Sequence, residues 1–234
     1  MRELLLAHRR GVREILVSVD VDAADILDEI IELADDAHVP IRQIGRGSLD
    51  AKARTDAPQG IIARAEPIRP VDLDDLLDTS GDVAPFLLAV DGVTDPHNLG
   101  ALLRSAECAG VTGVVLPRHR AVHVTATVAK AAAGAIEHLR FALVGGMPTA
   151  IGELGRAGVV TVGLDMTGPK TLWDLDGLDA AVAIVVGAEG KGLSRLARKR
   201  CQEVARIPLE GRIASLNASV AGALACYEVA RARR

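Results

Sequence analysis

The start of the chain combines helical and extended patterns of hydrophobic residues. Apolar residues 4–6 precede the apolar run 15–17, which predicts a helix leading into a short buried strand. Within residues 23–38 the apolar positions recur at helical spacing, and Pro40 then ends that helix and begins an extended segment. Residues 59–63 predict a last strand. The pattern therefore predicts a small α/β unit.

A change of pattern at residues 69–84 separates this unit from the remainder of the chain. Prolines and acidic residues replace the regular hydrophobic spacing, which predicts a linker between a first domain, 1–68, and a second, 85–234. The second domain repeats strand, turn and helix, which is typical of an α/β fold. Its predicted strands cover 86–90, 113–116, 159–164 and 181–186, and its predicted helices cover 100–109, 126–138, 147–156 and 215–231.

Composition and charge limit the classes of function. Only 2% of the 234 residues are aromatic, which argues against a base-stacking platform of the kind that reads single-stranded RNA. The formal net charge is -4, but basic residues concentrate in one stretch, where they can meet phosphate. These residues are Lys191, Arg195, Arg198, Lys199, Arg200 and Arg206.

Signals of export, membrane insertion and metal binding are missing from the sequence. No apolar run approaches the roughly 20 residues of a spanning helix, and the three cysteines form no C-x-x-C pair. We therefore expect a cytoplasmic protein with no membrane or metal partner. His119 and His123 stand four residues apart, but without a third ligand we interpret them as ordinary surface or core histidines.

The first segment with candidate chemistry runs from Asp91 to Gly100, in the order DGVTDPHNLG. It leaves a predicted strand, turns, and enters a helix that presents Arg104 about one and a half turns in. Asp and Asn in such a turn cap helices, and Gly relaxes the backbone. This segment alone leaves a structural and a functional interpretation open.

The second segment, VVGAEGKGLS at 185–194, is a strand that runs into a glycine-rich loop. Absent side chains leave room for a ligand to approach the backbone. The order G-x-x-G-x-G is not the dinucleotide fingerprint, and Lys191 is followed by Gly rather than Ser or Thr, so the phosphate-loop pattern also fails. Glu189 between the glycines indicates a partner, such as Arg104.

The third segment contains Ile207-Pro208-Leu209 and then Ser215-Leu216-Asn217, ahead of the last predicted helix. Its Ser and Asn are also good helix caps. Three such loops, each after a β-rich run of one α/β unit, are expected to converge at one edge of the sheet, where ligands of α/β folds bind. Together they favour a binding site over three separate capping motifs.

These segments closely resemble, in order, the three motifs of the SpoU branch of the SPOUT methyltransferases. That branch includes TrmH-type tRNA enzymes and 23S ribosomal RNA guanosine 2′-O-methyltransferases. The matches are Asp91-x-Val93-x-Asp95-Pro96-x-Asn98-x-Gly100-x-x-x-Arg104-x-Ala106-Glu107, Val186-Gly187-x-Glu189-Gly190-x-Gly192-Leu193, and Ile207-Pro208-Leu209 with Ser215-Leu216-Asn217. Lys130-x-x-x-Gly134-Ala135-x-Glu137 also resembles the family, and the match covers residues 85–232.

The resemblance implies a C-terminal α/β domain with a deep trefoil knot, a rare exception to the rule that chains are unknotted. It also implies a homodimer with a shared active site. The first domain resembles an L30e-like RNA-binding domain, with Gln59-Gly60 before its last strand and Pro58 where family members usually have His. S-adenosylmethionine is the implied cofactor, bound by loops that contain Gly187, Gly190, Gly192, Ile207, Leu209, Ser215, Leu216 and Asn217.

By family analogy the catalytic set is Asn98, Arg104, Glu189, Ser215 and Asn217, for attack of a ribose 2′-oxygen on a sulfonium methyl group. A guanidinium is very hard to deprotonate. Our hypothesis is therefore that Arg104 grips the ribose or an adjacent phosphate and is oriented by Glu189. The remaining three would fix the RNA and shape the cofactor loops.

The first domain's resemblance favours 23S ribosomal RNA as the substrate. A tRNA 2′-O-methyltransferase and a non-catalytic, RNA-binding ribosome assembly factor are the alternatives. The assembly factor is disfavoured because all five catalytic positions carry the family residue. A nicotinamide-dependent enzyme would require the dinucleotide fingerprint that the chain lacks.

Overall fold

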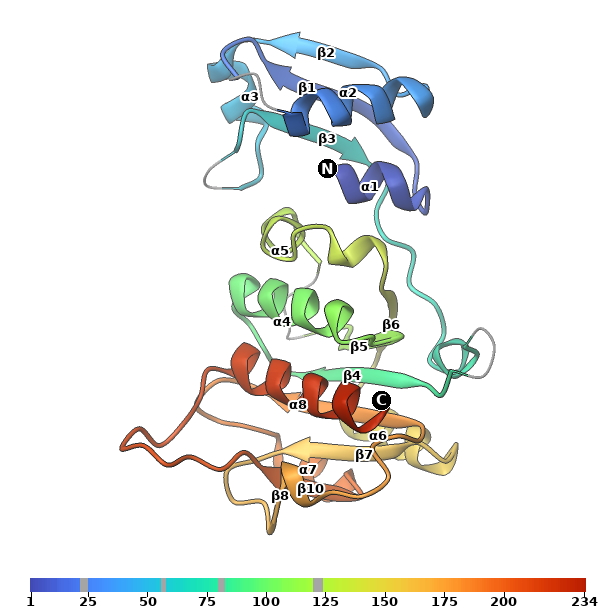
Figure 1. The fold of residues 1–234 in the computed structure, drawn as a ribbon, viewed down its shortest axis with the longest axis vertical. Helices are drawn as coiled ribbons and strands as arrows, with labels where there is room; N and C mark the ends of the chain where they lie inside the picture. Colours follow the sequence, from blue (N-terminus) through green and yellow to red (C-terminus); the bar gives the residue numbers. More distant parts are fainter. Residues whose placement is uncertain (22–24, 56–57, 80–82, 120–123) are drawn as a thin grey trace.

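The computed structural model describes residues 1–21, 25–55, 58–79, 83–119 and 124–234. Two regions follow one another along its long axis, a small three-stranded sheet with its helices and a larger seven-stranded sheet (Figure 1). No helix in the described part of the chain is long and apolar enough to cross a membrane.

The small region is the predicted α/β unit. Its sheet has the order β2-β1-β3, with β2 parallel and β3 antiparallel to the central strand. Ile15 and Val17 of that strand pack with Leu5 and Ile30 into a small core. The elements are α1 (Arg2–Ala7), β1 (Val12–Ser18), α2 (Asp25–Asp36), β2 (Ile41–Ile44), α3 (Arg46–Lys52) and β3 (Ile61–Ala65).

The connection between the regions contacts the larger one along much of its length. Val71 donates its backbone N–H to the carbonyl of Phe141 at 2.8 Å and forms a parallel bridge with Ala142. The short helix η1 (Asp74–Leu77) then places Leu76 fully inside the core of the larger region. The stretch expected as a linker is therefore partly integrated into the larger region.

The larger region is built on one sheet with the order β6-β5-β4-β9-β7-β10-β8, in which every recorded strand pair is parallel. Parallel sheets carry helices on both faces, so their central strands are apolar throughout. The strands are β4 (Phe86–Asp91), β5 (Gly113–Pro117), β6 (Arg140–Val144), β7 (Val160–Leu164), β8 (Lys170–Thr171), β9 (Val182–Gly187) and β10 (Glu203–Arg206).

Alternate residues of β4 enter two different cores. Phe86, Leu88 and Val90 face α4, α5 and α8, whereas Leu87 and Ala89 face η1, α6 and α7. The two-residue period of a strand therefore joins both helix layers to one sheet. The helices are α4 (Pro96–Cys108), α5 (Ala126–Ala131), η2 (Ala135–Glu137), α6 (Met147–Arg156), η3 (Leu172–Asp174), α7 (Arg195–Arg200) and α8 (Ala218–Ala232).

The α/β class and most predicted strands are confirmed, with corrections at three helices. The helix predicted at 126–138 is wrong in length, because Ala133 and Gly134 have positive φ and separate α5 from η2. A side chain at Gly134 would also meet Glu3 at 2.6 Å. The helix predicted from residue 100 begins at Pro96, and the helix predicted from residue 215 begins at Ala218.

Candidate active site

The first loop is fixed by the cap of α4. Asp95 is the N-cap, and its Oδ1 accepts a hydrogen bond from the backbone N–H of His97 at 2.9 Å. Pro96 occupies the first turn, where a missing N–H costs nothing. One turn on, Gly100 permits close packing of two helices, since a Cβ there would lie 2.4 Å from that of Ala131 in α5. These residues hold Asn98 at the carboxyl edge of the sheet.

The second loop turns back sharply after β9. Ala188 and Gly192 exchange two backbone hydrogen bonds of 3.0 and 2.8 Å. A Cβ on Gly187 would lie 2.2 Å from the carbonyl carbon of Gly192, so the chain's own turn fills the space at Gly187 that the sequence suggested for a ligand. Gly190 and Gly192 instead have φ of 71° and 64°, which favours glycine. The turn places Glu189 at its exposed tip.

The third loop, residues 207–217, projects from the body of the larger region (Figure 1). It ends at Asn217, the N-cap of α8, whose Oδ1 accepts hydrogen bonds from Ser219, at 2.8 Å from N and 2.6 Å from Oγ. Asn217 rather than Ser215 therefore caps the helix. Ser215 is exposed, with no side-chain hydrogen bond to any described residue.

The three loops meet through one hydrogen-bond network, defined by Asn98, Glu189 and Asn217. Glu189 Oε1 accepts from Nδ2 of Asn217 at 3.0 Å and from Nδ2 of Asn98. Asn217 Nδ2 also donates to Oδ1 of Asn98 at 2.9 Å, and Asn98 Nδ2 donates to Oδ2 of Asp95 at 3.0 Å. The predicted convergence of the loops is confirmed. The contribution of Asp95 was missed, although its spacing before Asn98 is an N-cap signal.

Arg104 is separate from this network. It lies six residues after Asn98, about 240° further around the helix, so the two side chains leave α4 in different directions. Arg104 is exposed and forms no ion pair or hydrogen bond with a described residue. The expected pairing of Glu189 with Arg104 is therefore wrong within this chain, where Oε1 of Glu189 accepts from both amides instead.

The loops fit a cofactor that is recognised through the backbone. Residues 208–216 take part in none of the backbone hydrogen bonds recorded among the described residues, so their N–H and C=O groups are available. Leu209 and Leu216 are 39% and 38% exposed and offer apolar contact surface beside these polar groups. Free backbone groups next to apolar side chains suit the adenosine part of S-adenosylmethionine.

Neither a cysteine nucleophile nor a metal centre is supported near these loops. Burial raises the pKa of Cys226 to about 12, and burial together with the charge of Asp91 does the same for Cys201. Within the described ranges no three His, Cys, Asp or Glu side chains are grouped to hold a metal ion. Of the histidine pair considered in the sequence, His123 lies outside the described residues.

This fold and these loops define a class of protein. Residues 85–227 match the family model of the SpoU rRNA Methylase family, and residues 2–71 match that of RNA 2′-O ribose methyltransferase substrate binding. The chain belongs to the SpoU rRNA methylase family. The predicted class, an S-adenosylmethionine-dependent RNA methyltransferase, is confirmed, whereas the knot and the individual roles of the site residues stay predictions.

Particular relatives agree with this assignment. A 23S rRNA (guanosine-2′-O-)-methyltransferase from Burkholderia sp is 43% identical over 204 residues, which are 87% of this chain and 82% of the relative. A crystal structure of an RNA 2′-O ribose methyltransferase superposes with a TM-score of 0.80 at 26% identity, over 99% of this chain and 84% of that one. The AdoMet complex of the SpoU methyltransferase AviRb from Streptomyces viridochromogenes shares the fold, with a TM-score of 0.79 at 24% identity over 98% and 86%.

Proposed function

We propose that the chain transfers a methyl group from S-adenosylmethionine to a ribose 2′-hydroxyl of 23S ribosomal RNA. The observation that carries the proposal is the meeting of three loops, through Asn98, Glu189 and Asn217, at one edge of a parallel sheet. The relative named for 23S rRNA supports this RNA, and the match to a family model of RNA 2′-O ribose methyltransferase substrate binding supports a ribose target. The enzyme meets this substrate in the cytoplasm.

In the reaction the ribose oxygen bonds to the methyl carbon while the carbon–sulfur bond breaks, and the hydroxyl proton leaves for solvent. Bound S-adenosylmethionine supplies a methyl group on a cationic sulfur. The protein's task is to align the two reactants. The network of Asn98, Glu189 and Asn217 fixes the three loops against one another, and Glu189 Oε2 accepts no hydrogen bond from a described residue, so it is available to a ligand.

Arg104 serves to hold the RNA. Its exposed guanidinium presents several donors in one plane, which matches two oxygens of a phosphate or of a ribose and its neighbouring phosphate. The group is cationic at any working pH, so it acts by positioning and charge rather than by removing the proton. We assign Ser215, in the projecting loop, to contact with the RNA or the cofactor.

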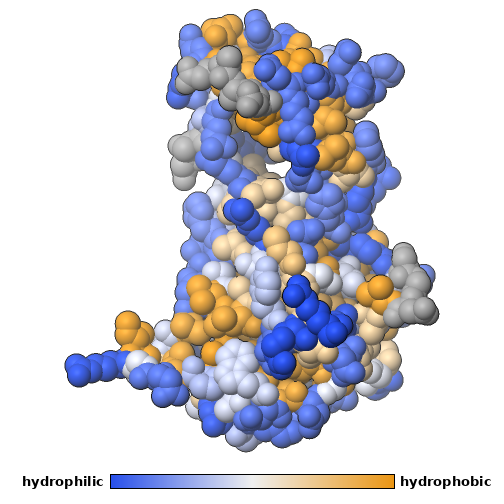
Figure 2. Space-filling model, in the orientation of Figure 1, coloured by the Kyte–Doolittle hydropathy of each residue, from blue (hydrophilic) through white to orange (hydrophobic). Residues whose placement is uncertain are grey.

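The working form is a homodimer formed through α8. Val220, Leu224 and Tyr227 recur at helical spacing along α8 and are 46%, 40% and 52% exposed. Figure 2 shows hydrophobic atoms gathered over α8 on the face where α4 also lies. Contiguous apolar side chains of this kind mark an interaction surface. Because Arg104 faces away from the network of its own chain, a second copy is the natural source of its partner loops.

The proposal is tested by supplying labelled methyl-S-adenosylmethionine with unmodified transcripts of 23S rRNA, 16S rRNA and a set of tRNAs. We expect label in 23S rRNA alone, lost with Arg104→Ala. Label in tRNA alone would contradict 23S rRNA as the substrate and favour a tRNA 2′-O-methyltransferase. Cofactor binding with no label in any RNA, including native ribosomal particles, would favour the assembly factor.

Light scattering at several concentrations tests the dimer, which Tyr227→Lys is expected to weaken.

A further inference from the structure

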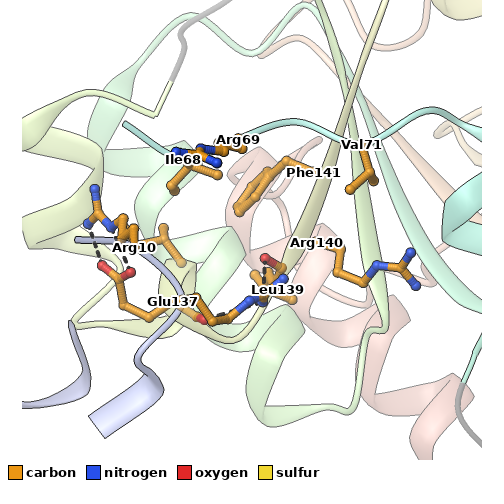
Figure 3. Close-up of a pocket in the computed structure, with 10 residues that line it drawn as sticks. Arg10, Ile68, Arg69, Val71, Glu137, Leu139, Arg140 and Phe141 are labelled. Atoms are coloured by element: carbon orange, nitrogen blue, oxygen red, sulfur yellow. Dashed lines mark hydrogen bonds and ion pairs between the residues drawn. The ribbon is translucent and has the colours of Figure 1, made fainter. Parts of the chain in front are cut away.

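The two regions are joined by a largely buried ion pair. Glu137, in η2 of the larger region, has a side chain that is only 5% exposed. Arg10, between α1 and β1 of the small region, meets both of its oxygens: Nε lies 2.8 Å from Oε2 and Nη2 lies 2.5 Å from Oε1. Figure 3 shows the two side chains pointing toward one another from different parts of the chain. Such a two-point contact fixes orientation as well as distance.

Further polar contacts surround this pair. The third nitrogen of Arg10, Nη1, donates to the carbonyl of Glu66 at 2.8 Å, just beyond the last strand of the small region. The neighbouring Arg9 donates from Nη1 to the carbonyl of Leu139 at 3.1 Å. At the start of α1, Oε2 of Glu3 lies 2.8 Å from Nε2 of His138. All these contacts reach residues 137–139 or the chain that leaves the small region.

The two regions have separate hydrophobic cores, although Ile68 in the chain between them packs against a core of the larger region. Among the described residues, the hydrophobic core of the small region shares no member with the two cores of the larger one. A cavity of roughly 190 Å³ lies beside the ion pair, between the regions. It is lined by Arg9, Arg10, Ile68, Arg69, Val71, Ile136, Glu137, Leu139, Arg140 and Phe141 (Figure 3). The polar contacts of Glu3, Arg9 and Arg10 therefore contribute to the alignment of the two regions.

The short helix η2, which carries Glu137, is connected to the candidate active site. Ile136 and Leu139, on either side of the ion pair, belong to the core that also contains Leu99 and Leu103 of α4. Helix α4 packs against η2 and carries Arg104. The ion pair thus connects the small region, through η2 and α4, to the side chain proposed to hold the ribose.

From these contacts we infer that Arg10 and Glu137 are positioning residues, which set the distance and angle between the RNA-binding region and Arg104 and so determine which ribose is presented for methylation. This inference rests on the proposed function. A buried ion pair is a poor source of net stability, because desolvation offsets its attraction. What the pair provides is a defined geometry. A misplacement of the reacting groups by about 1 Å is enough to lower a reaction rate about 100-fold.

Three variants isolate the pair. Glu137→Ala removes it and leaves Arg10 without its carboxylate, whereas Glu137→Gln keeps the shape and one acceptor oxygen. Arg10→Lys keeps the positive charge beside Glu137 but removes the two-point contact, so it is the variant to use if Glu137→Ala does not fold. Glu14→Gln is the matched control, because Glu14 pairs with Arg64 at 2.7 Å inside the small region only.

The first measurement needs no RNA. Nitroxide labels on Ser48→Cys and Asp176→Cys, both exposed positions in different regions, are placed in the Cys108→Ser background of the full chain. We expect one narrow distance distribution for the parent and for Glu14→Gln, and broad distributions for Glu137→Ala and Arg10→Lys. An unchanged narrow distribution in Arg10→Lys would overturn the inference, whatever the enzyme methylates.

The second measurement separates positioning from general damage. With the RNA identified as substrate, we expect kcat/KM for the RNA to fall about tenfold or more in Glu137→Ala and Arg10→Lys, with S-adenosylmethionine affinity unchanged. Glu137→Gln should recover part of the loss, and some label should move to neighbouring nucleotides. Equal falls in kcat/KM and cofactor affinity would contradict the inference. Absence of label with the parent protein would refute the proposed function but leave the distance measurement valid.

Discussion

The network of Asn98, Glu189 and Asn217 and the side chain of Arg104 both depend on helix α4, yet they differ in how complete they are. The network is formed within one chain: Glu189 accepts from both amides, and Asn217 also donates to Asn98. Arg104 has no partner among the described residues and lies on an exposed face with Ala101 and Cys108. With the roles proposed above, one chain prepares the cofactor side of the site, and the RNA side is completed where Arg104 meets the loops of a second copy.

Removing Arg104 is expected to have the largest effect. Arg104→Ala should lower methyl transfer at least about 100-fold, because it deletes the contact proposed to position the RNA, while S-adenosylmethionine affinity should change by less than about twofold. Initial rates and equilibrium binding measure the two quantities. Arg104→Lys should stay low, since a lysine lacks the planar two-point contact. Near-normal turnover of Arg104→Lys would contradict the proposed two-point contact of Arg104 with the RNA.

Mixing two inactive proteins tests whether the two halves come from different copies. Arg104→Ala and Asn217→Ala, each inactive alone, should regain about a quarter of parental activity after subunit exchange, because half of the dimers are mixed and each has one intact site out of two. Activity is measured against equal total protein. No recovery, with exchange verified by mass, would place both halves of the site within one chain.

Changing Asn217 separates helix capping from the network. Asn217→Asp keeps an oxygen that accepts from Ser219 at the N-cap. It removes the Nδ2 donor to Asn98 and Glu189, and it places a second carboxylate beside that of Glu189. We expect S-adenosylmethionine affinity to fall about tenfold, a value near 1.4 kcal/mol, with helix α8 still formed by circular dichroism. Ser219→Ala is the control and should leave cofactor affinity unchanged. Unaltered affinity in Asn217→Asp would show that the network does not shape the cofactor loops.

Cysteine reactivity is expected to give the smallest effect, a difference in alkylation rate between buried and exposed thiols. The pKa values of Cys201 and Cys226 are raised to about 12, so only about one thiol in ten thousand is ionised at pH 8 and reactivity should rise only toward pH 12. Cys108, exposed on the face of Arg104, should be alkylated first. Mass spectrometry after brief iodoacetamide treatment counts the modified sites. Early modification of Cys226 would contradict the packing of α8 on α4.

The sequence was sufficient for the features that depend on local pattern or on loop position. The α/β class followed from alternating strands and helices, and the meeting of Asn98, Glu189 and Asn217 followed from three loops at the ends of β strands. The strands β8 and β10 are too short, at two and four residues, to give a clear pattern. The break at Gly134 depends on the approach of Glu3 from another region, which no local pattern contains.

Long-range pairings of side chains were also beyond the sequence. Charge alone suggested Arg104 for Glu189, but the amides of Asn98 and Asn217 reach it first because α8 begins beside the loop. The pairing of Arg10 with Glu137 joins residues 127 positions apart, and either could equally have been an ordinary surface charge. Only the placement of α1 against η2 selects this pair.

The most direct test concerns where the methyl group is attached. RNA labelled by the parent protein is hydrolysed in alkali, which needs a free 2′-hydroxyl to cleave the chain, and the products are separated by size. Ribose 2′-O-methylation predicts label in alkali-resistant dinucleotides that disappear when Arg104→Ala replaces the parent. Label in mononucleotides would place the methyl group on a base and contradict the account.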